Sequence, residues 1–231
     1  MREIVFDTET TGLDPLQGDR LVEIGCIELV NRFPSGKVFH CYFNPERDMP
    51  AQALAIHGLS GEFLKDKPFF AHKAAELLDF LGDAPLVAHN AMFDLAFLNA
   101  ELERAGHAIV ARERMVDTLL IARRKHPGGA NRLDDLCLRY AIDNSRRTKH
   151  GALLDAELLA EVYIELIGAR QAQLILSQGS APAAAGDAPI VIRERTVPLA
   201  VRLTEGERAA HRQYIFSLGD NAIWRDYVSL D

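Results

Sequence analysis

EIVFDT (residues 3–8), LVEIGCIELV (residues 21–30) and KVFHCYF (residues 37–43) are the stretches that decide the fold. Each is rich in Val, Ile and Phe, which are favoured in β-strands. The segments between them are short, and Pro34-Ser35-Gly36 has the composition of a turn. The sequence therefore predicts three consecutive strands that form a meander.

After Pro50 the hydrophobic period becomes helical. Apolar residues recur at spacings of three and four over residues 71–81, and Gly82 is expected to end that helix. Asn90 is expected to cap a helix that ends at Gly106. The remaining pattern predicts short strands at 85–89 and 114–116 and helices at 92–105, 118–125, 132–140 and 153–166. Strands followed by alternating strands and helices predict an α/β fold with a mixed sheet flanked by helices.

The composition is that of a soluble globular protein, with 48% hydrophobic and 26% charged residues in 231. The sequence has neither a leader-like start nor an apolar run of about 18 residues, so we expect a cytoplasmic protein without a membrane span. Cys26, Cys41 and Cys137 are widely spaced among apolar residues. They predict small buried side chains rather than a disulfide framework or a zinc site.

Residues 177–189, SQGSAPAAAGDAP, have the composition of a flexible linker. The expected organisation is a domain over residues 1–176, the linker over 177–189 and a C-terminal segment over 190–231. Thr-Glu-Gly-Glu at 204–207 predicts a capping box that starts a helix ending near Gly219. The last segment is too short to bury its apolar residues alone, so it is expected to dock on a partner.

The charge distribution is unusual for a protein that binds nucleic acid. The chain has a formal net charge of −7, and residues 1–167 carry the whole excess, with 19 Lys and Arg against 26 Asp and Glu. Such a domain can act on a polyanion if its carboxylates hold metal ions and a partner delivers the substrate.

Three short patterns carry acidic side chains. Asp7 and Glu9 are two residues apart at the end of the first strand, so both carboxylates face the same side of the sheet. Asp94 falls in the first turn of a helix, where an acidic residue also complements the helix dipole. Taken singly, the patterns also fit a polar strand end and an ordinary helix start.

The third pattern is His150 with Asp155. Five residues along one helix turn the side chains about 140° apart, but Gly151 allows His150 to lie on the loop before the helix. Alone, the histidine would be read as solvated, because it follows the basic run 146–149. Together, four carboxylates and a histidine are what a two-metal phosphoryl-transfer site needs, with hard oxygen ligands and a base. Glycine-rich phosphate loops of the Walker or dinucleotide type are absent from the sequence.

These motifs resemble those of the DEDD family of 3′→5′ exonucleases, in its histidine branch. The resemblance covers about residues 1–167 and rests on the stretch 7–12, on His89-Asn90 with Asp94, and on His150 with Asp155. It implies a ribonuclease H-like fold with a mixed five-stranded sheet. The stretches 30–32, 141–145 and 147–156, and the linker with its tail, are most similar to the epsilon proofreading subunits of bacterial DNA polymerase III.

The resemblance also implies the roles of individual residues. Asp7, Glu9 and Asp155 would hold one Mg²⁺ or Mn²⁺, Asp7 would bridge to a second ion, and Asp94 would act on that second ion through water. His150 would be the general base. The loop that supports the terminal nucleotide of the DNA 3′ end would be Thr10, Thr11, Gly12 and Leu13. His57 is either a substrate contact or a turn residue, and both interpretations stay open.

By the same resemblance, residues 190–231 would bind the polymerase catalytic (alpha) subunit, and a small accessory subunit would bind the exonuclease domain. Gln171, Leu174 and Leu176 resemble a sliding-clamp motif, although they also fit a helix end running into the linker. Asp117 is expected to cap a helix, and His89 and Asn90 to shape a turn. The alternatives are an RNA-directed exonuclease of the same family and an adaptor that mainly bridges polymerase subunits.

Overall fold

The computed structural model describes residues 1–147, 149–169, 203–219 and 224. The chain divides into two units, Met1–Leu174 and Ile175–Asp231, which are described separately. The predicted linker 177–189 and the proposed clamp residues Gln171, Leu174 and Leu176 lie outside the described residues.

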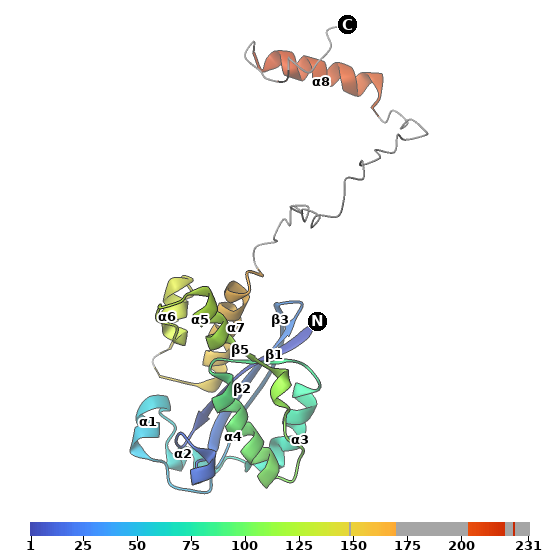
Figure 1. Cartoon of the computed structure of the whole chain (residues 1–231). Coiled ribbons are helices and arrows are strands. Elements are labelled where there is room, and N and C mark those ends of the chain that lie inside the picture. The colour runs from blue at the N-terminus through green and yellow to red at the C-terminus, as the bar shows by residue number, and fades with distance from the viewer. Residues whose placement is uncertain (148, 170–202, 220–223, 225–231) are drawn as a thin grey trace, which may run out of the picture. The chain divides into compact units, whose positions relative to one another are not determined.

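A mixed five-stranded sheet forms the centre of the first unit, as predicted (Figure 1). Its strands are β1 Arg2–Thr10, β2 Leu21–Val30, β3 Phe33–Tyr42, β4 Leu86–Ala88 and β5 Met115–Asp117, in the order β3-β2-β1-β4-β5. The first three strands pair antiparallel, and β1, β4 and β5 pair parallel. The carboxyl ends of β1, β4 and β5 therefore lie at one edge of the sheet.

The predicted turn at Pro34-Ser35-Gly36 is wrong, because these residues belong to β3. The chain reverses at Asn31 and Arg32, which both have positive φ angles of 52° and 72°. A two-residue turn of type I′ needs left-handed backbone at both positions, and the twist of this turn matches the twist of the flanking strands. Proline is tolerated at 34 because β3 is an edge strand.

Seven α-helices of the first unit are described, and the five predicted ones lie within two residues of their expected ends. They are α1 Ala51–His57, α2 Gly61–Lys65, α3 Phe70–Leu81, α4 Ala91–Arg104, α5 Thr118–Lys125, α6 Leu133–Arg139 and α7 Ala152–Leu166, with short 3₁₀ turns η1 Pro15–Gln17 and η2 Arg112–Arg114. Asn90 is the N-cap residue of α4, as predicted, but its side chain does not cap the helix. Asn90 has left-handed backbone angles and makes no side-chain capping bond; its N–H donates to Asp117 Oδ1 at 3.2 Å.

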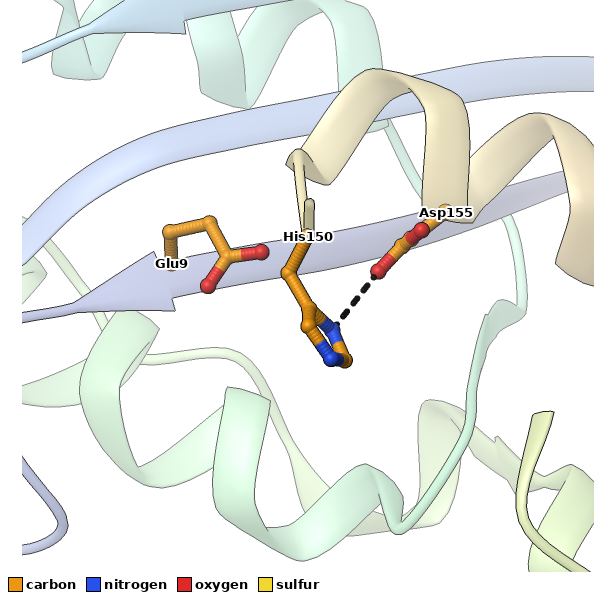
Figure 2. Close-up of side chains that lie close together, drawn as sticks. All are labelled: Glu9, His150 and Asp155. Atoms are coloured by element: carbon orange, nitrogen blue, oxygen red, sulfur yellow. Dashed lines mark hydrogen bonds and ion pairs between the residues drawn. The ribbon is translucent and has the colours of Figure 1, made fainter. Parts of the chain in front are cut away.

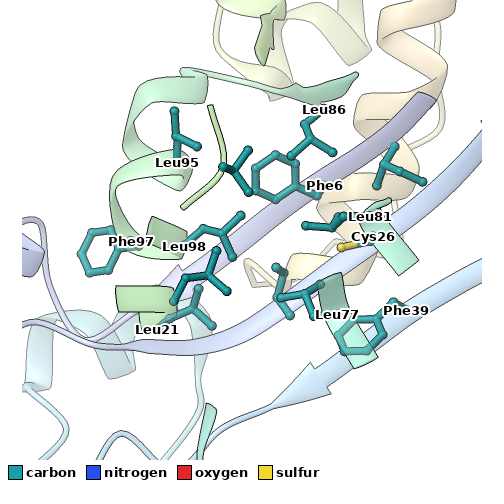
Figure 3. Close-up of a cluster of buried hydrophobic side chains, with 14 of the residues drawn as sticks. Phe6, Leu21, Cys26, Phe39, Leu77, Leu81, Leu86, Leu95, Phe97 and Leu98 are labelled. Carbon is teal, nitrogen blue, oxygen red and sulfur yellow. The ribbon is translucent and has the colours of Figure 1, made fainter. Parts of the chain in front are cut away.

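The two faces of the sheet are covered by different helices, and β1 shows how. Ile4 and Phe6 are fully buried in a cluster with α3 and α4, as Figure 3 shows for Phe6. Val5 faces the opposite way, into a cluster with α7 residues such as Leu159. Each such side chain contributes roughly 1.5–3 kcal/mol on burial. Because side chains alternate along a strand, Asp7 and Glu9 emerge on the α7 side of β1.

The second unit contains the helix α8, Glu205–Ser217. Thr204 Oγ1 accepts from Glu207 N–H, and Thr204 N–H donates to Glu207 Oε2 at 2.8 Å, so the predicted capping box is confirmed. Cys26, Cys41 and Cys137 are free thiols. Among the described residues, the helices are too short or too polar to cross a membrane.

Candidate active site

A cavity of about 960 Å³ opens at the carboxyl end of β1. The five predicted site residues all line it: Asp7, Glu9, Asp94, His150 and Asp155. They come from β1, from the first turn of α4, and from the start of α7 with the loop before it. The sequence pattern that singled them out thus corresponds to one place in the fold.

Asp94 reaches the cavity from the face of the sheet opposite to α7. It lies in the first turn of α4 and is 3% exposed. Thr8 points to the α4 side because it alternates with Asp7, and its hydroxyl donates to Asp94 Oδ1 at 2.7 Å. This bond fixes the Asp94 carboxylate at the end of β1.

His150 and Asp155 converge because the helix begins between them. Gly151 is the N-cap of α7, so His150 lies on the preceding loop and Asp155 in the first turn. His150 Nδ1 lies 3.2 Å from Asp155 Oδ2. Figure 2 shows that Glu9, His150 and Asp155 point into the same space. One possible ligand atom of each lies within 4.8 Å of those of the other two.

Gly25 allows α7 to approach the sheet this closely. It pairs with Asp7 across the β1–β2 ladder. A Cβ at this position would lie 2.3 Å from the Cα of Leu153, at the start of α7. Only glycine leaves room for the helix backbone here, and the contact brings Asp155 beside Asp7 and Glu9.

The carboxylates are held in surroundings that disfavour their charge. Burial, and then the negative charges of Asp94, Glu9 and Asp155, raise the pKa of Asp7 well above its usual value. Burial, and then mainly the charge of Asp155, raise the pKa of Glu9 to about 8. The pKa of Asp94 is raised to about 7, chiefly by burial. Like charges gathered in this way are stabilised by a cation.

Arg147 supplies a positive charge that sequence reasoning missed. Its guanidinium donates from Nε to Asp155 Oδ1 at 2.5 Å and from Nη2 to Asp155 Oδ2 at 2.7 Å. Nη1 also contacts Asp134, and Nη2 lies 2.7 Å from His150 Nδ1. Burial alone would raise the pKa of Asp155, but the bonds from His150 and Arg147 lower it.

The donor set fits a hard divalent cation. Five carboxylates line the cavity. Asp134 is paired with Arg147, and three of the four predicted site carboxylates are buried, namely Glu9, Asp94 and Asp155. Oxygen ligands of this kind are those preferred by Mg²⁺ and similar ions, and an ion would offset the burial and the charge repulsion that raise the pKa values of Asp7 and Glu9. The arrangement can therefore bind metal and hold a phosphate at the end of β1.

The expected substrate loop lies beside the cavity rather than in its lining, which includes none of Thr10, Thr11, Gly12, Leu13 and His57. Asp19 lies against this loop, accepts a hydrogen bond from the Thr11 hydroxyl at 3.2 Å, and would clash with a Cβ on Gly12. Leu13 is 84% exposed. His57 ends α1, and its Nδ1 accepts from Leu59 N–H at 3.0 Å, which is the geometry of a turn residue.

His89 and Asp117 hold the neighbouring backbone. His89 contacts the Thr118 hydroxyl through Nδ1 and the Asn131 carbonyl through Nε2, each at 2.9 Å. Asp117 Oδ1 accepts from Leu119 N–H at 2.9 Å and caps α5. These contacts fit the shaping and capping functions expected from the sequence.

Similar sequences are found among replication proteins. The DNA polymerase III subunit epsilon of Escherichia coli is 40% identical over 236 residues, covering 97% of each chain. The protein of the same name from Rickettsia felis is 54% identical over 174 residues, covering 74% of this chain and 76% of its own. Residues 4–163 match the protein family described as Exonuclease (RNase T).

Solved structures share the fold at low sequence identity. Exonuclease I superposes with a TM-score of 0.63 at 19% identity, covering 74% of this chain and 41% of its own. The nuclease domain of 3′hExo, a DEDDh family member bound to rAMP, has a TM-score of 0.63 at 16% identity, covering 73% of this chain and 92% of its own. The fold is therefore the ribonuclease H-like fold of the DEDD exonucleases, as expected. From the sequence matches and this fold together, the chain belongs to the exonuclease family and, within it, to the DNA polymerase III epsilon subunits.

Proposed function

We propose that this metal-dependent exonuclease removes nucleoside 5′-monophosphates from single-stranded or mispaired 3′ ends of DNA and proofreads for a replicative polymerase. One observation carries the proposal: the four predicted carboxylates and His150 line a single cavity at the end of β1. It is supported by the similarity to epsilon subunits over nearly the whole length of the chain. Hydrolysis of a phosphodiester needs charge neutralisation, an activated water and a stabilised leaving oxygen.

The carboxylates would hold two divalent cations, either Mg²⁺ or Mn²⁺. Asp7, Glu9 and Asp155 are assigned to one ion, Asp7 also to the second, and Asp94 to the second through water. The raised pKa values of Asp7 and Glu9 support this assignment, because the cavity gathers more negative charge than its own residues neutralise. When bound, the ions lower the pKa of water and stabilise the leaving 3′-oxygen.

His150 would accept the proton of the attacking water. Its Nδ1 faces Asp155 and Arg147. Both of these contacts are made at Nδ1, so Nε2 is the nitrogen left to meet the water. Asp155 would then orient the imidazole as well as hold a cation.

The terminal nucleotide would lie against Thr10, Thr11, Gly12 and Leu13, with the exposed Leu13 side chain against its base. His57 remains a candidate contact. Its Nε2 is buried and has no hydrogen-bond partner among the described residues. Buried polar groups usually have a partner, and a polar group of the nucleotide could provide it.

The polymerase catalytic subunit would bind residues 190–231. In the described part of this segment, Tyr214 is 62% and Trp224 57% exposed, and such side chains commonly anchor interfaces. We further propose that a small accessory subunit binds the exonuclease domain and that Gln171, Leu174 and Leu176 bind the sliding clamp. The protein would act in the cytoplasm, where the bacterial chromosome is copied.

The test is product analysis with purified full-length protein. A single-stranded oligodeoxynucleotide labelled at its 5′ end is expected to give a ladder shortened from the 3′ end, with nucleoside 5′-monophosphates as product. Chelation of divalent ions should abolish the ladder. Stronger hydrolysis of the matched oligoribonucleotide would favour the RNA-directed alternative, and no hydrolysis with intact polymerase binding would favour the adaptor.

A further inference from the structure

One part of the cavity wall carries two arginines without an acidic partner. It is formed by α5, the loop that follows and the start of α6, and it includes Arg123 and Arg132. The acidic residue of this wall, Asp134, is paired with Arg147. The Arg123 and Arg132 side chains are exposed. Within the described part of the chain, neither makes an ion pair, whereas Arg147 in the same cavity is paired with Asp155 and Asp134. Arg123 and Arg132 are therefore available to an anion that enters the cavity.

This wall belongs to a segment whose charge is opposite to that of the whole protein. Residues 118–150 contain eight Lys and Arg against three Asp, a net charge of +5 in a chain of −7. Single-stranded DNA carries one negative charge per nucleotide, and its affinity for proteins depends strongly on neutralising those charges. Three of the eight cations, Arg123, Arg132 and Arg147, line the cavity.

The loop that carries Arg132 is held in a fixed shape. Asn131, 9% exposed, donates from its side-chain amide to Gly129 O at 2.8 Å. Arg139 donates to Ala130 O at 2.9 Å and to Asn131 Oδ1 at 3.3 Å. His89 contacts the Asn131 carbonyl at 2.9 Å, which ties the loop to the end of β4. A pre-ordered loop loses little entropy when Arg132 binds a ligand.

From these observations, and resting on the proposed function, we propose that Arg123 and Arg132 bind the phosphates of nucleotides on the 5′ side of the scissile linkage. The scissile phosphate lies at the carboxylates, so the remaining strand has to leave the cavity along one of its walls. A wall of carboxylates repels a phosphate. Arginine presents several N–H donors in a plane that matches phosphate oxygens.

The experiment compares two substrates that differ in their upstream phosphates. One is a single-stranded oligodeoxynucleotide, and the other is the p-nitrophenyl ester of thymidine 5′-monophosphate, which contains only the scissile phosphate. Full-length protein with Arg123→Ala and Arg132→Ala is expected to show a KM for the oligonucleotide that is raised roughly ten- to hundredfold, because two charge-assisted contacts are lost. The selectivity for oligonucleotide over ester should fall by the same factor.

Salt dependence gives a second readout. Each lost phosphate contact makes the slope of log KM against log salt shallower by roughly 0.7 for a single strand, so the double variant should differ from wild type by roughly 1.4. Arg124→Ala is the matched control. Arg124 is an exposed neighbour on α5 that does not line the cavity, and its loss should leave both KM and slope close to wild type.

The outcomes separate this inference from the proposed function. An unchanged KM for the oligonucleotide in the double variant would overturn the inference. An equal rise of this KM in Arg124→Ala, or an equal rise of the KM for the nitrophenyl ester in the double variant, would also overturn it. Wild-type protein that does not shorten DNA from its 3′ end would instead contradict the proposed function. A raised KM and shallower salt slope, confined to the oligonucleotide and to the double variant, support the phosphate site.

Discussion

Arg147 donates a hydrogen bond to each carboxylate oxygen of Asp155, with Nε–Oδ1 at 2.5 Å and Nη2–Oδ2 at 2.7 Å. Both side chains are almost fully buried, at 7% and 3% exposure. This pair joins the loop before α7 to the helix and, through Asp134, to α6. Arg147 thus positions Asp155 while it neutralises part of the carboxylate cluster.

Arg147→Met should therefore destabilise the metal-free protein. Breaking one side of a buried ion pair costs about 3–5 kcal/mol, which for a domain of this size lowers the Tm by roughly 10 °C. Thermal denaturation with EDTA measures this. Mg²⁺ should recover more of the Tm in the variant than in wild type, because the ion replaces a missing positive charge. A variant whose EDTA-treated Tm equals that of wild type would show that the pair is dispensable.

The metal-free protein should lose stability as the pH rises from about 5 to about 8. The pKa of Glu9 is about 8 and that of Asp94 about 7, both above their values in an unfolded chain. A group whose pKa is raised on folding contributes stability at low pH, and this is lost as the pH passes through the folded pKa. Thermal melts in EDTA at several pH values check the prediction, and Mg²⁺ should flatten the dependence. A Tm in EDTA that is constant or rises over this range would contradict it.

His150→Gln should slow hydrolysis by roughly 10²–10⁴-fold, the usual contribution of a general base. The loss is expected in kcat, because the imidazole is proposed to act on the attacking water and not on substrate binding. The measurement is kcat and KM at saturating Mg²⁺, with the Tm of the variant as a folding control. A kcat close to that of wild type would mean that His150 has another function.

Much of the fold followed from local pattern. The β-favouring residues over 21–30 predicted β2. The three-and-four spacing over 71–81 predicted α3, because burial of one helix face imposes that period. The turn at Asn31 and Arg32 was missed because proline and glycine nearby gave the stronger turn signal. Backbone angles at two ordinary residues are set by strand pairing, which composition does not encode.

The site residues that the motifs name all reach the cavity, but their supports could not be read from the sequence. Arg147 lies in a basic run that resembles a solvated stretch, and its burial depends on how α6 packs near α7. Gly25 lies in the middle of a strand, where only the approach of α7 explains it. The contact of Gly25 joins segments more than a hundred residues apart. The contact of Arg147 with Asp134 joins segments that are separated by most of the helix α6.

Truncation after Ser177 should leave hydrolysis of free oligonucleotides intact and abolish co-purification with the polymerase catalytic subunit. The reason is that residues 190–231 are proposed to carry the docking surface, whereas the described lining of the cavity comes from residues between Asp7 and Asp155. In the full-length chain, Tyr214→Ala with Trp224→Ala should weaken the complex. Gln213→Ala, an exposed neighbour of Tyr214 on α8, should not. Tight binding by the truncated chain would put the docking surface on the exonuclease domain.

The most direct test of the active site is the hydrolysis of a 5′-labelled single-stranded oligodeoxynucleotide by Asp7→Asn, measured in a single turnover with saturating protein and Mg²⁺. The substitution keeps the size of the side chain and removes the charge at the centre of the carboxylate cluster. The rate is expected to fall roughly a thousandfold or more, since a lost ligand removes both water activation and charge stabilisation, while the EDTA-treated protein should melt no lower than wild type. A rate within tenfold of wild type would contradict the assignment of this cavity as the catalytic centre.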